Sequence, residues 1–160
     1  MSSGANPVSG HRQPELLGQT VVLIGGSAGI GLETARRARA EGADVVLTAR
    51  HPDRLEQASR EVDARSTAAF DANDTAALKR FFDSLPDPID HVLITGPGPD
   101  YAPLLEMDPD QVRHSLASHV VLALEVARHA GGRMRPGGTL LLMGGTGGKK
   151  ISRDLGLASA

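Results

Sequence analysis

The sequence TVVLIGGSAGIG, residues 20–31, carries the strongest structural signal in this chain. Its first five residues are a short apolar run rich in β-branched side chains, which is typical of a strand buried on both faces. Glycines follow at once, and residues 30–41 favour a helix that ends at Gly42. The stretch therefore predicts a strand, a glycine-rich turn and a helix in direct succession.

The rest of the chain repeats this alternation of apolar runs and helical patterns. Strands are predicted at 20–24, 44–48, 66–70, 91–95 and 139–143, and helices at 30–41, 51–62, 74–85 and 109–130. Such alternation implies a parallel sheet with helices on both faces, and right-handed crossovers then favour a doubly wound order. We therefore expect a three-layer α/β/α fold with about five strands. Ligands bind such sheets past the carboxyl ends of the strands, where the strand order reverses.

The glycine-rich turn has the composition of a phosphate-binding turn. Gly25 can adopt tight-turn dihedrals, Gly29 lets the backbone approach a pyrophosphate, and Gly31 lets the helix pack closely on the strand. The other predicted contacts in the turn are Ser27, Ala28 and Ile30. Backbone N–H groups and the positive helix end would receive the phosphates of a dinucleotide. The alternative is a turn that is merely tight; an ATPase is disfavoured because the pattern GxxxxGK[ST] is absent.

Bulk properties exclude several other classes of function. A net charge of −2 gives no sign of a nucleic-acid partner, and a chain without cysteine has no disulfide or thiolate metal site. His114 and His119 are not spaced as a helical metal pair, so we predict no metal. No apolar run reaches the roughly 20 residues of a membrane span. Residues 1–16 are predicted to be a disordered leader, and the protein to be cytoplasmic.

The end of the second strand predicts which dinucleotide is bound. NAD-binding proteins usually place a carboxylate there for the ribose 2′-hydroxyl, whereas this chain has Arg50. The planar guanidinium of Arg50 suits a 2′-phosphate, with Ser27 as a helper, so NADP(H) is preferred over NAD(H). The alternative is that Arg50 is only a solvated loop charge.

The spacing GxxxGIG of the turn resembles the short-chain dehydrogenase/reductase family, although Ile24 stands where that family commonly has Thr. The resemblance covers residues 17–160 as an NAD(P)-binding Rossmann domain and implies further strands beyond residue 160. It also implies that Asp71, with the backbone of Ala72, contacts the adenine, and that Gly96 lies beside the nicotinamide ribose. Asp71 has an alternative role in shaping the turn before the next helix.

The resemblance also implies a catalytic Ser, Tyr, Lys and Asn, and none of these stands at its expected position. His119 occupies the Asn position, and Thr146 is the hydroxyl nearest to the Ser position. Gly156 and Ala160 fall on the Tyr and Lys positions. Thr146 and His119 are therefore the catalytic candidates, against the commoner roles of a turn hydroxyl and a packed or solvated histidine.

Two functions remain open from the sequence. One is an NADP(H)-dependent oxidoreductase of the short-chain type acting on a small carbonyl or alcohol substrate. The other is a catalytically inactive NADP(H)-binding module or sensor. The helix at 109–130 carries an apolar stripe that consists of Val112, Leu116, Val120 and Leu124. This stripe predicts a homo-oligomer contact, or else it only covers the sheet.

Overall fold

The computed structural model describes residues 15–86, 88–95 and 102–144. The strands are β1 (Thr20–Ile24), β2 (Asp44–Ala49), β3 (Ser66–Ala69), β4 (Ile89–Ile94) and β5 (Met134–Leu142). The helices are α1 (Gly29–Ala40), α2 (Pro52–Val62), α3 (Thr75–Ser84), η1 (Leu104–Glu106), α4 (Pro109–Leu116), η2 (Ala117–Val121) and α5 (Leu122–Gly131). In the described part of the chain, no helix is long and apolar enough to cross a membrane.

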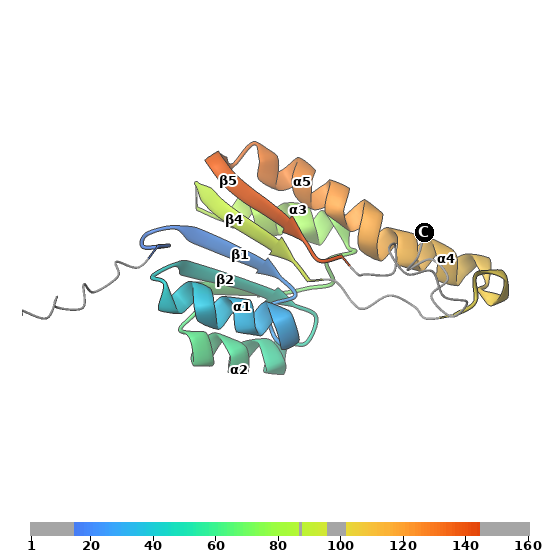
Figure 1. The fold of residues 1–160 in the computed structure, drawn as a ribbon, viewed down its shortest axis with the longest axis horizontal. Coiled ribbons are helices and arrows are strands. Elements are labelled where there is room, and N and C mark those ends of the chain that lie inside the picture. Colours follow the sequence, from blue (N-terminus) through green and yellow to red (C-terminus); the bar gives the residue numbers. More distant parts are fainter. Residues whose placement is uncertain (1–14, 87, 96–101, 145–160) are drawn as a thin grey trace, which may run out of the picture.

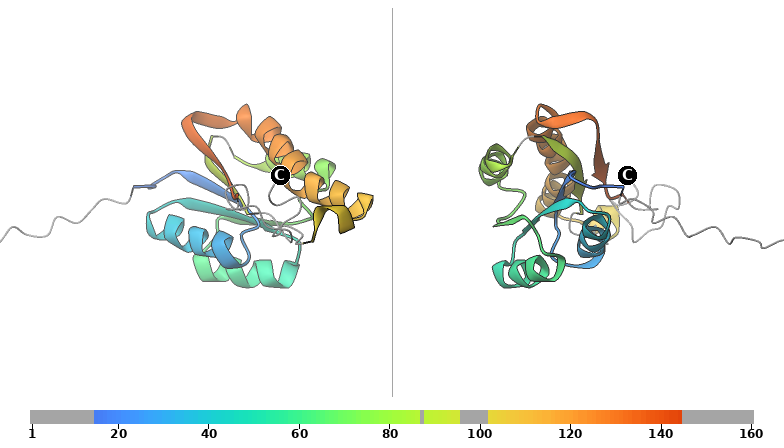
Figure 2. Two further views of the ribbon diagram at one scale, coloured as in Figure 1. Left: turned by 45° about the vertical axis from the view of Figure 1, so that its right-hand side comes forward. Right: turned by 90° about the vertical axis from the view of Figure 1, so that its left-hand side faces the viewer.

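The five strands form one parallel sheet in the order β3-β2-β1-β4-β5. Helices α1 and α2 cover one face, and α3 and α5 cover the other (Figures 1 and 2). The predicted three-layer, doubly wound Rossmann architecture is confirmed. The strand order reverses between β1 and β4, which places the expected ligand site beside the carboxyl ends of these two strands.

Strand β1 lies at the centre of the hydrophobic core and is buried on both faces. Val22 and Ile24 pack toward α3 and α5, whereas Val21 and Leu23 pack toward α1 and α2. Val22 and Leu23 have no exposed surface. Burying a side chain of this size contributes about 1.5–3 kcal/mol, so β1 anchors the glycine-rich turn that follows it.

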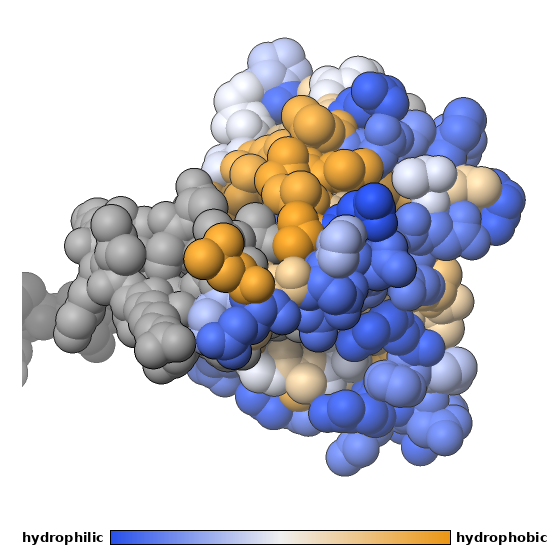
Figure 3. Space-filling view, turned by 90° about the vertical axis from the view of Figure 1, so that its right-hand side faces the viewer, coloured by the Kyte–Doolittle hydropathy of each residue, from blue (hydrophilic) through white to orange (hydrophobic). Residues whose placement is uncertain are grey.

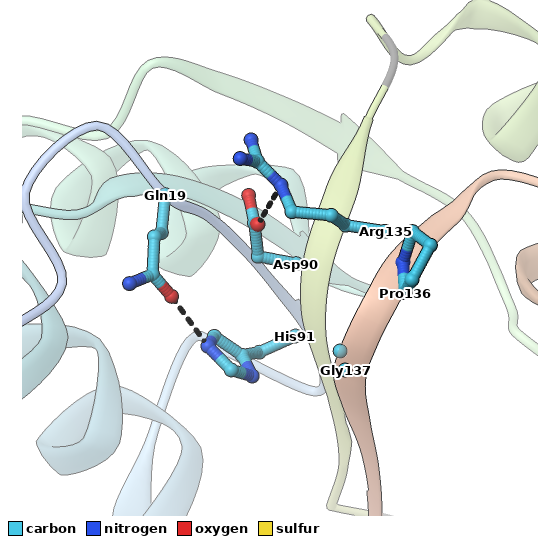
Figure 4. Close-up of a pocket in the computed structure, with 7 residues that line it drawn as sticks. Gln19, Asp90, His91, Arg135, Pro136 and Gly137 are labelled. Carbon is cyan, nitrogen blue, oxygen red and sulfur yellow. Dashed lines mark hydrogen bonds and ion pairs between the residues drawn. The ribbon is translucent and has the colours of Figure 1, made fainter.

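Strand β5 begins at Met134 rather than at Thr139, because residues 135–138 form a bulge opposite Asp90 of β4. The buried carboxylate of Asp90 accepts a hydrogen bond from Thr20 N at 2.8 Å. It also pairs with Arg135 Nε at 2.7 Å (Figure 4). Asp90 thereby joins the beginnings of β1, β4 and β5 at the amino edge of the sheet.

The predicted helix at 109–130 is interrupted by the π-helical segment η2. Its buried side is formed by Ser115, Ser118, Leu122, Val126 and Ala130. The apolar stripe points outward instead: Leu116 is 45% exposed, Val120 53% and Leu124 60%. The interpretation that the stripe only covers the sheet is therefore wrong, and apolar side chains gather on the outer surface of this end of the molecule (Figure 3).

Candidate functional site

The glycine-rich turn between β1 and α1 has a backbone that side chains would disturb. Gly25 has φ +97°, and a Cβ on it would lie 2.3 Å from the carbonyl oxygen of Thr95. A Cβ on Gly31 would lie 2.2 Å from the carbonyl oxygen of Gly25. Both distances are below van der Waals contact, so the close approach of α1 and β4 to the turn requires glycine at these two positions.

The turn is held from both neighbouring strands. On the β2 side, the amides of Gly25 and Gly26 donate to the carbonyl oxygen of Thr48 at 3.0 and 2.9 Å. On the β4 side, Thr95 N donates to Ile24 O at 2.9 Å, and Thr95 Oγ1 donates to Gly25 O at 2.9 Å. These bonds fix the turn at the reversal of strand order. The sequence pattern predicts Thr95 at the end of a strand but does not indicate the role of its hydroxyl, for which a hydroxyl at that edge of the sheet is the available signal.

The outer side of the turn is open and has the character of an anion site. Gly29 has φ +52°, and a Cβ on it would meet nothing within 4 Å, so the space beside its backbone is free among the described residues. Ala28 at the N-cap of α1 supplies no side-chain acceptor, and the first turn of α1 contains no acidic residue. The positive end of this 12-residue helix therefore faces the open space without a negative partner. Ile30, beside it, is 58% exposed.

Arg50 directly follows β2, next to the glycine-rich turn, and its side chain is exposed. Within the described ranges its guanidinium has no carboxylate partner. Ser27 of the turn is half-buried. The charge of Arg50 fits an anionic group of a bound dinucleotide, whereas a carboxylate at this position would repel such a group.

The residues that follow β3 form a tight turn before α3. The carboxylate of Asp71 accepts from Asn73 N at 3.0 Å and from Asn73 Nδ2 at 3.3 Å, so it shapes this turn. Ala72 is half-buried and packs against the core. Gly96, the predicted neighbour of the nicotinamide ribose, lies outside the described residues.

His119 lies on η2 with an exposed side chain. Its Nδ1 donates to the carbonyl oxygen of Ser115 at 2.9 Å, which leaves Nε2 as the nitrogen that can meet a substrate. A π-helical turn is a frequent feature of functional sites. Thr146, the other catalytic candidate, lies outside the described residues. Across the residues that the structure describes, no group of three or more His, Cys, Asp or Glu side chains is placed to hold a metal ion.

Comparison with known proteins decides the family, because a sequence model described as short chain dehydrogenase matches residues 19–152. The chain belongs to the short-chain dehydrogenase/reductase family. A probable oxidoreductase of Streptomyces lividans is 30% identical over 123 residues, which are 72% of this chain and 41% of that protein. An NADP-dependent (R)-specific alcohol dehydrogenase of Lentilactobacillus kefiri is 38% identical over 72 residues, covering 43% of this chain and 29% of that protein.

Solved structures of the family share the fold. A short-chain dehydrogenase/reductase from Serratia marcescens superimposes with a TM-score of 0.84 at 24% identity, over 90% of this chain and 62% of that one. The chain thus spans less than two thirds of the length of these family members.

Proposed function

We propose that this chain is the cofactor-binding part of an NADP(H)-dependent oxidoreductase of the short-chain type. Its substrate would be a small carbonyl compound or alcohol, and the nicotinamide, when bound, supplies or accepts the hydride. The observation that carries the proposal is the glycine-rich turn, which is held by both neighbouring strands and is open beside the uncapped end of α1. The free guanidinium of Arg50 follows β2, the strand next to β1. The Lentilactobacillus relative, which is NADP-dependent, supports the same cofactor.

Each residue of the site has a distinct role in this proposal. The turn, from Ser27 through Ala28, Gly29 and Ile30 to Gly31, holds the pyrophosphate on backbone N–H groups. Arg50, with Ser27, binds the 2′-phosphate through a charge-assisted hydrogen bond. Asp71 and Ala72 contact the adenine, and Gly96 keeps the backbone open beside the nicotinamide ribose.

For the chemistry, we propose His119 and Thr146 as the groups that act on the substrate. With Nδ1 held by the Ser115 carbonyl, His119 Nε2 is the ring nitrogen that would exchange a proton with the substrate. The hydroxyl of Thr146 would donate a hydrogen bond to the substrate oxygen. The second candidate function is an inactive NADP(H) sensor, favoured by Gly156 and Ala160 at the family's Tyr and Lys positions.

The exposed stripe on α4 to α5 supports a further proposal about assembly. Leu116, Val120 and Leu124 are apolar and half exposed, whereas the opposite side of the same helix packs on the sheet. We infer that a second copy of this chain covers the stripe, which would bury these side chains in a homo-oligomer.

Thermal unfolding of the purified chain with NADPH, NADP⁺ or NADH tests the central proposal. A ligand at about 100 times its Kd adds about 2.7 kcal/mol to the folded state. We expect a clear rise in Tm with NADPH and a smaller one with NADH. A sharp transition that no cofactor moves would refute the proposal. Reduction of a carbonyl panel by NADPH separates the two functions, because the sensor binds the cofactor without turnover.

A further inference from the structure

Most arginines in the described part of the chain are held by an acceptor. Those in ion pairs with carboxylates are Arg36, Arg37, Arg39, Arg60, Arg65, Arg113, Arg128 and Arg135, and Arg133 donates to two backbone carbonyls. Within the described ranges, Arg50, Arg54 and Arg80 have no such acceptor. Two of these three, Arg50 and Arg54, stand at the end of β2 and in the first turn of α2.

Ion pairs between α1 and α2 show which sides of the two helices face each other. Arg36 Nε of α1 pairs with Glu61 Oε1 of α2. Arg39, one turn further along α1, pairs with Asp63 at the end of α2, with 2.5 Å between Nη2 and Oδ2. The helices start at the same edge of the sheet and lie side by side in both figures (Figures 1 and 2).

The same register can be followed back to the beginnings of the helices. Seven residues are about two α-helical turns, roughly 10 Å, and return to nearly the same side of a helix. Seven residues before Arg36 lies Gly29, and seven before Glu61 lies Arg54. Arg54 is therefore on the side of α2 that faces the open, phosphate-binding side of the turn.

The local surroundings of Arg54 leave its charge available. Its side chain is exposed, and its neighbours one turn onward, Gln57 and Ala58, offer no carboxylate. Side chains of a helix lean toward its N-terminus, so the guanidinium of Arg54 extends toward the carboxyl edge of the sheet. Asp53 is one position away, about 100° around the helix, and lies on a different side.

We propose that Arg54 is a second specificity-determining residue, which binds the ribose 2′-phosphate of NADP(H) together with Arg50. This inference rests on the proposed function. The two guanidiniums would approach the phosphate from the end of β2 and from α2, and a phosphate with about two negative charges satisfies both cations. NAD(H), which has a hydroxyl in that place, gains nothing from Arg54.

The test compares Arg54→Gln with the wild type by calorimetric or fluorescence titration of NADPH and NADH. We expect the Kd for NADPH to rise about tenfold or more and that for NADH to stay within about twofold, since only NADPH loses a charge-assisted hydrogen bond. Arg80→Gln is the matched control, because Arg80 is exposed, without an acceptor among the described residues, and lies on α3. Arg54→Lys should recover part of the NADPH affinity.

A second pair of ligands tests the phosphate contact without the nicotinamide. Adenosine 2′-monophosphate should bind more weakly to the Arg54→Gln variant at low salt, whereas adenosine 5′-monophosphate should not distinguish the two proteins. Equal loss of NADPH and NADH affinity, or no loss of either, would overturn the role of Arg54. Failure of the wild type to bind any of these ligands would instead refute the proposed function.

Discussion

The hydroxyl of Thr95 donates its single proton to the carbonyl oxygen of Gly25 at 2.9 Å, and the carbonyl oxygen of Ile24 lies 3.2 Å from the same hydroxyl. The Thr95 side chain fits here because residues 25 and 31 are glycines. A Cβ on Gly25 would lie 2.5 Å from Thr95 Oγ1, and a Cβ on Gly31 would lie 2.9 Å from it. The end of β4 is thus tied to the glycine-rich turn by one side chain across the reversal of strand order.

Replacing Thr95 by Val should loosen this tie without changing the size of the side chain. The lost hydrogen bond should lower the free energy of unfolding by about 1 kcal/mol and weaken NADPH binding. Thr95→Ser, which keeps the hydroxyl, should remain close to wild type. Urea denaturation and NADPH titration give both values. Thr67→Val on the exposed face of β3 is the control, and an equal loss in that variant would show that the Thr95 hydroxyl has no special role.

Gly31→Ala should separate α1 from the turn. Its Cβ would lie 2.2 Å from a backbone oxygen, which cannot rotate away, so the helix must shift. We expect a loss of about 1–3 kcal/mol, as for other overpacked sites, together with loss of the NADPH-induced rise in Tm. Gly131→Ala, in a helix with nothing within 4 Å, should be neutral or stabilise by up to about 1 kcal/mol. Equal stability of both variants would contradict this packing argument.

Asp90→Ala should be the most destabilising of the acidic substitutions. It leaves the buried Thr20 amide without its acceptor and breaks the pair with Arg135, at an expected loss of about 3 kcal/mol. Arg135→Gln should lose less, because the Arg135 side chain is 54% exposed. The exposed pair of Lys79 and Asp83 supplies the control: Asp83→Ala should change the unfolding free energy much less than Asp90→Ala does. Guanidinium denaturation ranks the three variants.

Leu124→Glu should dissociate the proposed homo-oligomer, because it places a charge at the most exposed position of the stripe. Light scattering after size exclusion should show a smaller mass for this variant than for the wild type. Leu17→Glu is the matched control, since Leu17 is 73% exposed and lies outside the stripe. A wild type that stays monomeric at every concentration would refute the proposal.

Acid should remove one contribution to stability that Glu33 makes on α1. Hydrogen bonds from Arg37 and then Arg36 lower the pKa of Glu33 below its usual range. A carboxyl whose pKa is lower in the folded state stabilises that state above its unfolded pKa, and this contribution disappears as the pH falls through the folded value. The Tm of Glu33→Gln should therefore depend less on pH in the acid range than that of wild type. Parallel curves would exclude the effect.

The helices, the strands and the glycine-rich turn can be predicted from the sequence because their signals are local. The buried run at 20–24, the glycines after it and the helix-forming residues beyond them each act on their own neighbours. Parallel pairing then follows from the alternation. By contrast, the early start of β5 depends on an ion pair between Asp90 and Arg135, which lie far apart in the sequence. Pro136 and Gly137 in this stretch are also typical of a turn, so the local sequence does not predict a strand there.

The long helix shows a different limit of periodicity. Its spacing identified an apolar stripe but not the direction in which the stripe points. The buried side carries Ser115 and Ser118 near its beginning, where a sequence pattern predicts apolar residues. Nothing local marks η2 either. The roles of Thr95 and Arg54 cannot be predicted from the sequence for a related reason, because they depend on which residues lie opposite them in the fold.

The π-helical segment η2 has a consequence for how this chain can change during evolution. It accommodates one more residue than an α-helical turn would, so losing a single residue between Ala117 and Val121 would straighten the helix. Because an α-helical turn spans the same angle with one residue fewer, the parts before and after the segment would keep their orientation. Leu116 would stay on the side shared with Leu124, and Ser115 would stay on the buried side. The helix should therefore tolerate the loss of one residue within this segment, whereas the same loss within α5 would turn part of its buried side away from the sheet by about 100°.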